Sequence, residues 1–400
     1  MTISETLLWR QQQFQKLLKE KNLGAILFLM PARDGFDLYF TGASAKAYPP
    51  YDTALQSMDT CVLMAQEKKP IVIHASYLTG PGEPDPLLTH FGVDNGDVGD
   101  YVWSVNQKAE LYIDALSENH RLGLVNPNDL REELYQFIRK YVPDVECMDV
   151  TFEANLLKAE KCPGDLEEEK LSVRAVDRLF AKMSSTLRPM ALESDVVNHI
   201  RIDASGIGQV GNYVSDWVIV DMKAAPDGGL SVKEPLPFPG RHLEFGDRIQ
   251  INVLAALNNS YSAGCGRCFV MGDPCEETVR YWELAVKAQN AAVSAIRPGA
   301  TIAQAVQKAR DEVYIPNNLE CGASNWIFGL GLNIAMAEPP MAVPIWEDVP
   351  LKEGMFLCIA PRIEIPDKDP FCCMDTFLVT KEGCERLTKT SRQIKTLFAV

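Results

Sequence analysis

The sequence predicts an α+β protein made of a small N-terminal α/β domain, residues 1–155, and a larger C-terminal domain, residues 156–400. The chain has 400 residues, more than one ordinary core holds, and 46% of them are apolar, as in globular proteins. Helical and strand-like patterns alternate over roughly the first 150 residues, whereas the remainder groups its helices apart from its paired strands. These two observations set the fold class and the boundary.

The first domain opens with a helix and continues as alternating elements. Apolar residues fall at helical spacing from Ser4 to about Glu20, and "GAILFLM" from Gly24 is a strand-like run. Further strand and helix patterns follow in the segments "CVLMAQ", "KPIVIHASY", "LYIDALSENHRLGLVN" and "DLREELYQFIRKYVPDVECMDV". This alternation is typical of an α/β domain.

The second domain begins with helices and then pairs its strands. A Pro-Gly breaker at 163–164 leads into a long amphipathic helix, and a second helix precedes Ile207. Hairpin-like strands are expected from 210 to 272, two helices from Glu276 to about Val313, and further strands to the end. Grouped helices and antiparallel strands indicate an α+β domain.

Composition excludes several classes of partner. The formal charge of −15 argues against nucleic acid, because binding a polyanion requires a basic face. No stretch approaches the roughly 18 consecutive apolar residues of a membrane span, and the charged N-terminal segment does not match a signal peptide. An odd number of cysteines, eleven, favours reduced thiols over a disulfide framework. We therefore expect a cytoplasmic protein that binds neither nucleic acid nor membrane.

Four segments of the second half carry a family resemblance. They are "LEFGDRIQINVLAALNNSYSAGCGRCFVMGDPCEE", "AVKAQNAAVSAIRPGATIAQAV", "GLGLNIAMAEPPM", and "PLKEGMFLCIAPRIEIP" followed by "MDTFLVTKEGCERLT". With the order of elements, they resemble the creatinase, aminopeptidase P and methionine aminopeptidase family (M24). The resemblance covers most of the chain. It implies a C-terminal domain with the pita-bread fold.

The resemblance also implies that this chain differs from the family's metal enzymes at the metal-ligand positions. The family's metal enzymes hold two divalent ions with two aspartates, a histidine and two glutamates, which activate a bridging water. The matching positions in this chain are Asn252, Gly264, Leu330, Ala360 and Met374. One amide oxygen and four side chains with little affinity for hard cations cannot replace that set. We therefore expect no metal and no other cofactor.

Three functions remain open. The first is a metal-independent, creatinase-like hydrolase acting on a C–N or related bond of a small polar metabolite. The family's catalytic histidine is not matched, however, because Pro235 and Leu236 stand where it is expected. The second is a catalytically inactive binding protein, and the third is a lyase or isomerase that reuses the pocket.

The candidate site follows from strand alternation and from the resemblance. Alternation places Asn252, Cys268, Cys358, Arg362 and Cys372 on the faces that carry ligands in the family. Arg362 is the candidate to bind a carboxylate, and the alternative is a surface ion pair. The matched Arg267 and Asp375 are expected to be structural.

Glu338, in "AEPPM", matches an acidic residue of the family. It is the candidate general base if it is buried beside Asn333 and Arg362, and the alternative is a hydrogen bond that stabilises the fold.

The thiols at this site have three interpretations. Small buried residues that fill space are the simplest, because free cysteine is among the most buried residue types. A reactive thiolate and a soft-metal site are the alternatives. Cys265 and Cys268 form a C-x-x-C without a second pair, and no histidine stands in a ligand cluster.

A segment of the first domain suggests a homodimer. The stretch "ARDGFDLYFTGASAKAYPPYD" looks like the region by which family members contact a dimer partner. Arg33, Phe36, Tyr39 and Tyr48 are the residues expected to reach the partner's pocket and bind a small zwitterion there. The alternative for these side chains is packing in the domain core.

Overall fold

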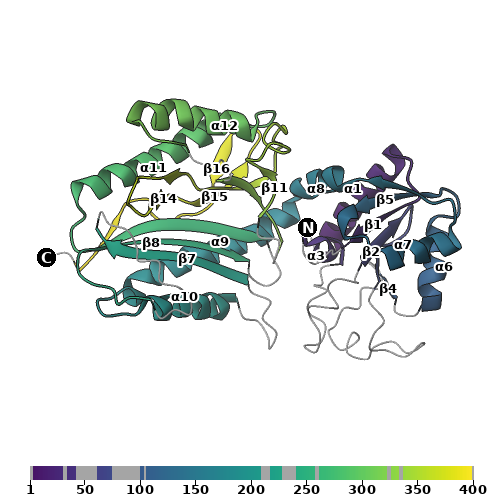
Figure 1. The fold of residues 1–400 in the computed structure, drawn as a ribbon, viewed down its shortest axis with the longest axis horizontal. Coiled ribbons are helices and arrows are strands. Elements are labelled where there is room, and N and C mark those ends of the chain that lie inside the picture. The colour runs from purple at the N-terminus through teal and green to yellow at the C-terminus, as the bar shows by residue number, and fades with distance from the viewer. Residues whose placement is uncertain are drawn as a thin grey trace. The chain divides into compact units, whose positions relative to one another are not determined.

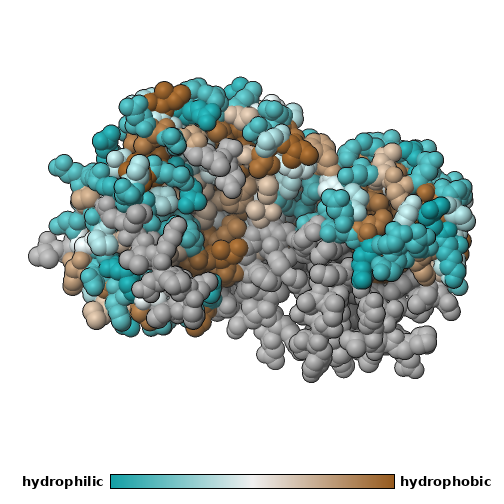
Figure 2. Space-filling view, in the orientation of Figure 1, coloured by the Kyte–Doolittle hydropathy of each residue, from teal (hydrophilic) through white to brown (hydrophobic). Residues whose placement is uncertain are grey.

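A computed structural model gives the fold (Figure 1) and describes residues 3–29, 34–41, 61–73, 100–102, 105–208, 217–227, 240–256, 261–321, 326–332 and 337–398. The chain divides into two compact units. Unit 1 holds Met1–Lys158 and Cys162–Gly164, and unit 2 holds Ala159–Lys161 and Asp165–Val400. None of the described helices is long and apolar enough to cross a membrane. Hydrophilic side chains cover much of the coloured surface in Figure 2.

Unit 1 is built on a six-stranded mixed sheet in the order β4-β3-β2-β1-β5-β6. Its strands are β1 (Ala25–Leu29), β2 (Cys61–Ala65), β3 (Ile71–Ile73), β4 (Asp100–Val102), β5 (Arg121–Val125) and β6 (Glu146–Asp149). Its helices are α1 (Ile3–Glu20), α3 (Phe36–Thr41), α6 (Val105–Ala115), α7 (Glu132–Tyr141) and α8 (Thr151–Ala159). Every residue of β1 is buried, as expected of a central strand covered on both faces.

Unit 2 begins with two helices and a long antiparallel sheet. The helices are α9 (Pro163–Thr186) and α10 (Glu193–Gly208), and the strands are β7 (Trp217–Pro226), β8 (Asp247–Ala256) and β9 (Ser262–Met271). The C-terminal strand β17 (Lys395–Leu397) completes the sheet in the order β17-β9-β8-β7. Gly246, with φ at 87°, makes the turn into β8 that few other residues tolerate.

Two helices then lead to a second sheet. These are α11 (Glu276–Ala295) and α12 (Ile302–Ala309), and α12 starts at a capping box between Thr301 and Gln304. The second sheet, in the order β11-β10-β12-β15-β16, holds β10 (Ile327–Leu330), β11 (Ala337–Met341), β12 (Phe356–Ile359), β15 (Asp375–Val379) and β16 (Cys384–Arg386). Between β12 and β15 in sequence, β13 (Arg362–Ile363) pairs with β14 (Phe371–Cys372) as a short two-stranded sheet. Figure 1 shows α11 and α12 on one side of the strands and α10 on the other.

The second of the two helices predicted between Glu276 and Val313 ends in irregular turns that its sequence pattern does not predict. Helix α12 passes at Arg310 into a π-helical turn, Arg310–Tyr314, followed by a 3-10 turn, Ile315–Asn317. The Tyr314 hydroxyl donates a hydrogen bond of 2.9 Å to the Arg362 carbonyl. The irregular turn therefore positions a side chain that holds β13 in place.

Candidate functional site

The hairpin of β8 and β9 forms the base of the candidate site. Its antiparallel register places Asn252 opposite Gly266 and Leu254 opposite Gly264. Side chains of a strand alternate between its faces, so Asn252, Leu254 and the two glycines share one face.

The two sheets of unit 2 meet at this face. Gly266 and Met374 form an antiparallel bridge, with the Gly266 amide donating to the Met374 carbonyl at 2.8 Å. The Gly264 amide donates to Thr376 Oγ1 at 2.8 Å, and that hydroxyl donates back to the Gly264 carbonyl at 3.0 Å. The backbone bridge at Gly266 and the Thr376 hydroxyl thus hold β9 against β15.

The remaining two matched positions lie on the neighbouring strands. Leu330 ends β10, which pairs with β12, and Ala360 follows β12 and donates its amide to the Trp326 carbonyl at 2.8 Å. Leu332, two residues after Leu330, bridges to Tyr261 at the start of β9. The fold therefore brings these positions to the same sheet junction as Gly264 and Met374.

Other side chains occupy the space that ligands at the two glycines would need. A Cβ atom on Gly264 would lie 2.9 Å from Cys358 Sγ and 3.5 Å from Met374 Cε. A Cβ atom on Gly266 would lie 2.3 Å from Asn252 Oδ1 and 2.9 Å from Met374 Cβ. Real Cβ atoms do not approach other atoms at 2.3 or 2.9 Å. The thiol and the thioether therefore fill this face of the hairpin.

The donor set at the five positions does not fit two divalent cations. Asn252 offers one neutral amide oxygen, and Gly264, Leu330, Ala360 and Met374 offer no hard ligand. Over the described part of the chain, no group of three or more His, Cys, Asp and Glu side chains is arranged to hold a metal ion.

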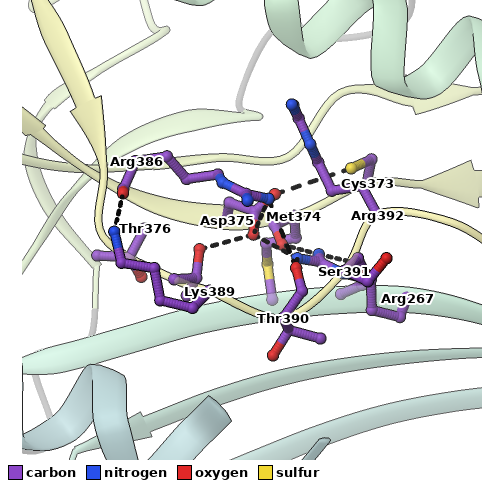
Figure 3. Close-up of polar contacts among 12 residues, drawn as sticks. Arg267, Cys373, Met374, Asp375, Thr376, Arg386, Lys389, Thr390, Ser391 and Arg392 are labelled. Carbon is purple, nitrogen blue, oxygen red and sulfur yellow. Dashed lines mark hydrogen bonds and ion pairs between the residues drawn. The ribbon is translucent and has the colours of Figure 1, made fainter.

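A complete polar network supports the junction from the other face of β9 (Figure 3). The Arg267 guanidinium, 2% exposed, donates two hydrogen bonds through Nη2, at 2.6 Å to Asp375 Oδ1 and at 2.8 Å to the Thr390 carbonyl. Its Nη1 donates to the carbonyls of Gly266 and Met374, and its Nε to that of Ser391. The buried Asp375 also accepts from Thr388 Oγ1 at 2.6 Å. Arg267 and Asp375 thus join β9, β15 and the C-terminal segment.

Several polar side chains lie at the edge of the junction. Asn252 accepts from Gln250 Nε2 at 2.9 Å and donates from Nδ2 to Asp221 Oδ2 at 3.3 Å. Gln250 also exchanges hydrogen bonds with the backbone of Cys372, and Cys372 pairs in register with Arg362. We call Asp221, Asn252 and Arg362 the polar rim. The rim holds one carboxylate, one amide and one guanidinium.

Asp221 was missed by sequence reasoning. It lies in the strand segment "WVIVDMKAAP" and is exposed, and the family resemblance assigns it no role. Its register partner across β7 and β8 is Asn252. A charged residue inside an apolar strand, paired with a predicted site residue, is the signal that could have identified it.

Arg362 lies at the surface of its strand pair. Its guanidinium is 47% exposed and lies 3.8 Å from Glu364 Oε1. Arg362 is nevertheless close enough to Cys372 to lower the pKa of that thiol, which burial raises to about 12. The guanidinium thus faces both solvent and the edge of the junction.

The site thiols are buried. Burial raises the pKa of the Cys268 thiol to about 12 and that of the Cys358 thiol well above its usual range. The Cys372 thiol donates to the Ala360 carbonyl at 3.6 Å, and the Cys268 thiol to the Phe269 carbonyl at 3.9 Å. These surroundings favour neutral thiols at pH 7, because a thiolate needs solvent or nearby cations.

Glu338 has a different partner from the one expected. Its carboxylate forms an ion pair with Lys161 Nζ, and these side chains are 3% and 1% exposed. Arg362 pairs with Glu364 instead. Asn333, the other residue expected near Glu338, lies outside the described residues.

The N-terminal candidates fall into two groups. Phe36 and Tyr39 are fully buried in unit 1, where their rings pack edge to face against Phe14 at 6.1 and 6.0 Å between centroids. This is the core-packing alternative for these two side chains. Arg33 and Tyr48 lie outside the described residues.

Known structures share this fold. The X-Pro aminopeptidase of Thermotoga maritima superposes with a TM-score of 0.75 at 18% identity, over 97% of this chain and 99% of that chain. The dipeptidase PepE of Mycobacterium ulcerans gives a TM-score of 0.75 at 18% identity, over the full length of both chains. The predicted α+β fold with a pita-bread domain is confirmed.

The sequence comparisons identify the family. A Xaa-Pro dipeptidase of Pyrococcus furiosus is 33% identical over 157 residues, which span 38% of this chain and 43% of that protein. The probable dipeptidase PepE of Mycobacterium bovis is 27% identical over 233 residues, 57% of this chain and 58% of that protein. The model of metallopeptidase family M24 matches residues 168–381, which hold the whole junction of β8, β9, β10, β12 and β15. The chain belongs to metallopeptidase family M24.

Proposed function

We propose that this chain is a metal-independent hydrolase of M24 type that acts on a C–N bond of a small zwitterionic metabolite. The observation that carries the proposal is the polar rim of Asp221, Asn252 and Arg362 beside positions that offer no metal ligands. The relatives include a Xaa-Pro dipeptidase and a probable dipeptidase, which supports hydrolysis as the general chemistry. The matched region spans less than half of the first of them, so the substrate is part of the proposal.

The rim suits both ends of a zwitterion. A guanidinium binds a carboxylate through two parallel hydrogen bonds, and Arg362 is exposed enough to do so. The Asp221 carboxylate, oriented by Asn252, can pair with a substrate cation or accept a proton from water. The rim therefore supplies an anchor and a base, and both groups are accessible from solvent.

The reaction that we propose uses water as the nucleophile. Asp221 accepts one proton from the water, whose oxygen forms a bond to the substrate carbon while the C–N bond breaks. The nitrogen leaves with its electron pair and takes up the proton that Asp221 received, which returns Asp221 to its carboxylate form. General base catalysis of this kind contributes about a hundredfold to ten-thousandfold to the rate.

Metal content tests the first part of the proposal. Elemental analysis of purified protein should find no stoichiometric manganese, cobalt, zinc or iron, and chelator should not change its activity, because the junction offers no pair of carboxylates to bridge two ions. About two divalent ions per chain with chelator-sensitive hydrolysis of Xaa-Pro dipeptides would contradict it.

Substitution at the rim tests the second part. A panel of N-substituted amino acids and small guanidino acids serves as substrate, and Asp221→Asn and Arg362→Ala should each lower kcat/KM at least about tenfold. Glu133→Gln, which changes an exposed carboxylate paired with Arg131 in unit 1, is the control and should retain activity. Unchanged turnover in both rim variants would contradict the assignment.

A second function is favoured by a separate observation. Cys358 and Cys372 are buried with raised pKa values, and Glu338 is paired with Lys161, so these three candidate site residues have surroundings typical of structural roles. This favours a non-catalytic binding protein. Native mass spectrometry that finds a retained metabolite, with no turnover of that compound by the purified protein, would select this function.

A homodimer is the oligomeric state that we propose, and the family resemblance of the first domain supports it. Light scattering at micromolar concentration should give twice the chain mass. A monomer at every concentration tested would contradict the proposal.

A further inference from the structure

Three ionisable side chains of unit 2 are buried together, outside the polar rim. Lys161 precedes α9, Glu169 lies on α9 and Glu338 lies on β11. Lys161 forms the ion pair with Glu338, and its ammonium lies 4.6 Å from the centre of the Tyr261 ring. We call these three residues the buried triad.

Glu169 is the unusual member of the triad. Its side chain is 0% exposed, and neither carboxylate oxygen has a hydrogen-bond partner among the described residues. The Ser172 hydroxyl, almost one turn further along α9, is also buried without such a partner. Burial of an ionised carboxylate without hydrogen-bond partners costs a large desolvation free energy. The neutral acid costs much less, so burial favours the protonated form.

The charge count of the triad is unbalanced. Two carboxylates accompany one ammonium, so the fully ionised triad carries a net charge of −1 inside the core. The other ionisable groups near Glu169 do not correct this. Cys358 on β12 is within electrostatic range of it, and the buried Asp165 is one turn earlier on α9. Neither of them brings a positive charge.

We propose that Glu169 binds a proton in the folded chain, so that the triad is electrically neutral, and that loss of this proton destabilises unit 2. Burial and the neighbouring Glu338 carboxylate both raise the pKa of Glu169, although Lys161 lowers it. The proton site lies near the candidate site, because the Cys358 thiol that fills the space above Gly264 is within its electrostatic range.

The direction of the pH effect follows from linkage. A carboxyl whose pKa is raised in the folded state binds more protons there than in the unfolded state. Its stabilising effect is complete below the unfolded pKa of about 4.5 and is lost as the pH rises toward the folded pKa. Glu169→Gln removes this dependence, because a neutral amide of similar shape does not titrate.

Thermal unfolding between pH 5 and pH 9 tests the proposal. The Tm of Glu169→Gln minus that of wild type should increase with pH, by about 3 °C per pH unit. Glu167→Gln is the matched control, because Glu167 is an exposed carboxylate on the same helix, bonded to Lys170. The control should keep the wild-type pH dependence. Parallel curves for wild type and Glu169→Gln would overturn the proposal.

Infrared spectroscopy gives a direct readout that does not depend on stability. At pH 7, wild-type protein and Glu167→Gln should both show the carbonyl band of a protonated carboxylic acid, and Glu169→Gln should lack it. If Glu169→Gln fails to fold, the wild-type band still decides, because no band at pH 7 means that Glu169 is ionised. Neither readout requires catalytic activity, so failure of the proposed hydrolase function would leave this test intact.

Discussion

The two faces of strand β9 differ in what they carry. One face presents Arg267, whose three nitrogens donate five hydrogen bonds, to Gly266 of β9 itself, to Met374 and Asp375, and to the C-terminal segment. The other presents Gly264 and Gly266, and neighbouring side chains such as Cys358 and Met374 fill the space above them. The first face carries a buried ion pair between two residues that the family resemblance predicts to be structural, and the second carries glycine where the resemblance implies a metal ligand.

This difference shows that support and chemistry are separable in this fold. Arg267, Asp375 and the backbone bridge between Gly266 and Met374 connect the two sheets without using the side chain of any of the five matched positions. The ligand face can therefore change its chemistry without loss of the fold, provided that the emptied volume is filled again. Four substitutions or modifications measure the contrast between the two faces.

The largest effect is expected from the supporting face. Arg267→Ala leaves Asp375 buried without its main cation, and removal of one partner from a buried pair costs about 3–5 kcal/mol. Urea unfolding followed by tryptophan fluorescence measures the loss. A decrease of less than about 1 kcal/mol would mean that the network is not required for stability.

Thiol reactivity measures how closed the other face is. Cys268 and Cys372, with pKa values raised to about 12 by burial, should react with iodoacetamide at pH 7 at least about a hundredfold more slowly than the exposed Cys275. Their rates should increase with pH over the whole accessible range, because the thiolate reacts. Mass spectrometry of the native protein gives the rates, and fast labelling of Cys372 would favour the reactive-thiolate interpretation.

Repacking above Gly264 should have a moderate effect. Gly264→Ala places a methyl group 2.9 Å from Cys358 Sγ, and overpacking of this kind costs about 1–3 kcal/mol. Combination with Cys358→Ala should recover part of the loss, which a double-mutant cycle measures. Gly383→Ala is the control, because its nearest contact would be 4.0 Å away. Additive losses would contradict direct contact between the two positions.

The smallest stability effect is expected at the rim. Arg362→Ala breaks an ion pair between partners that are 47% and 56% exposed, and such pairs contribute less than about 1 kcal/mol. Chemical denaturation should therefore distinguish this variant clearly from Arg267→Ala. A loss comparable to that of Arg267→Ala would show that Arg362 supports the fold rather than a ligand.

The sequence by itself determined the fold class and the identity of the residues at the five positions. Periodicity and turn residues depend on local geometry, and the segments around Gly246, Gly329 and Met374 keep the spacing of the family. The shared face of Asn252, Gly264 and Gly266 also follows from strand alternation, because the register of a hairpin fixes which side chains share a face.

Only the tertiary structure decided how these side chains are paired. The acidic run "DLEEEKL" is typical of a solvated helix surface, yet one of its three glutamates, Glu169, is fully buried. Lys161 and Glu338 are 177 residues apart in sequence and still form an ion pair, and Asp221 reaches Asn252 from a separate strand. Partners of this kind depend on three-dimensional packing, and their pKa values depend on burial, which no local pattern of residues encodes.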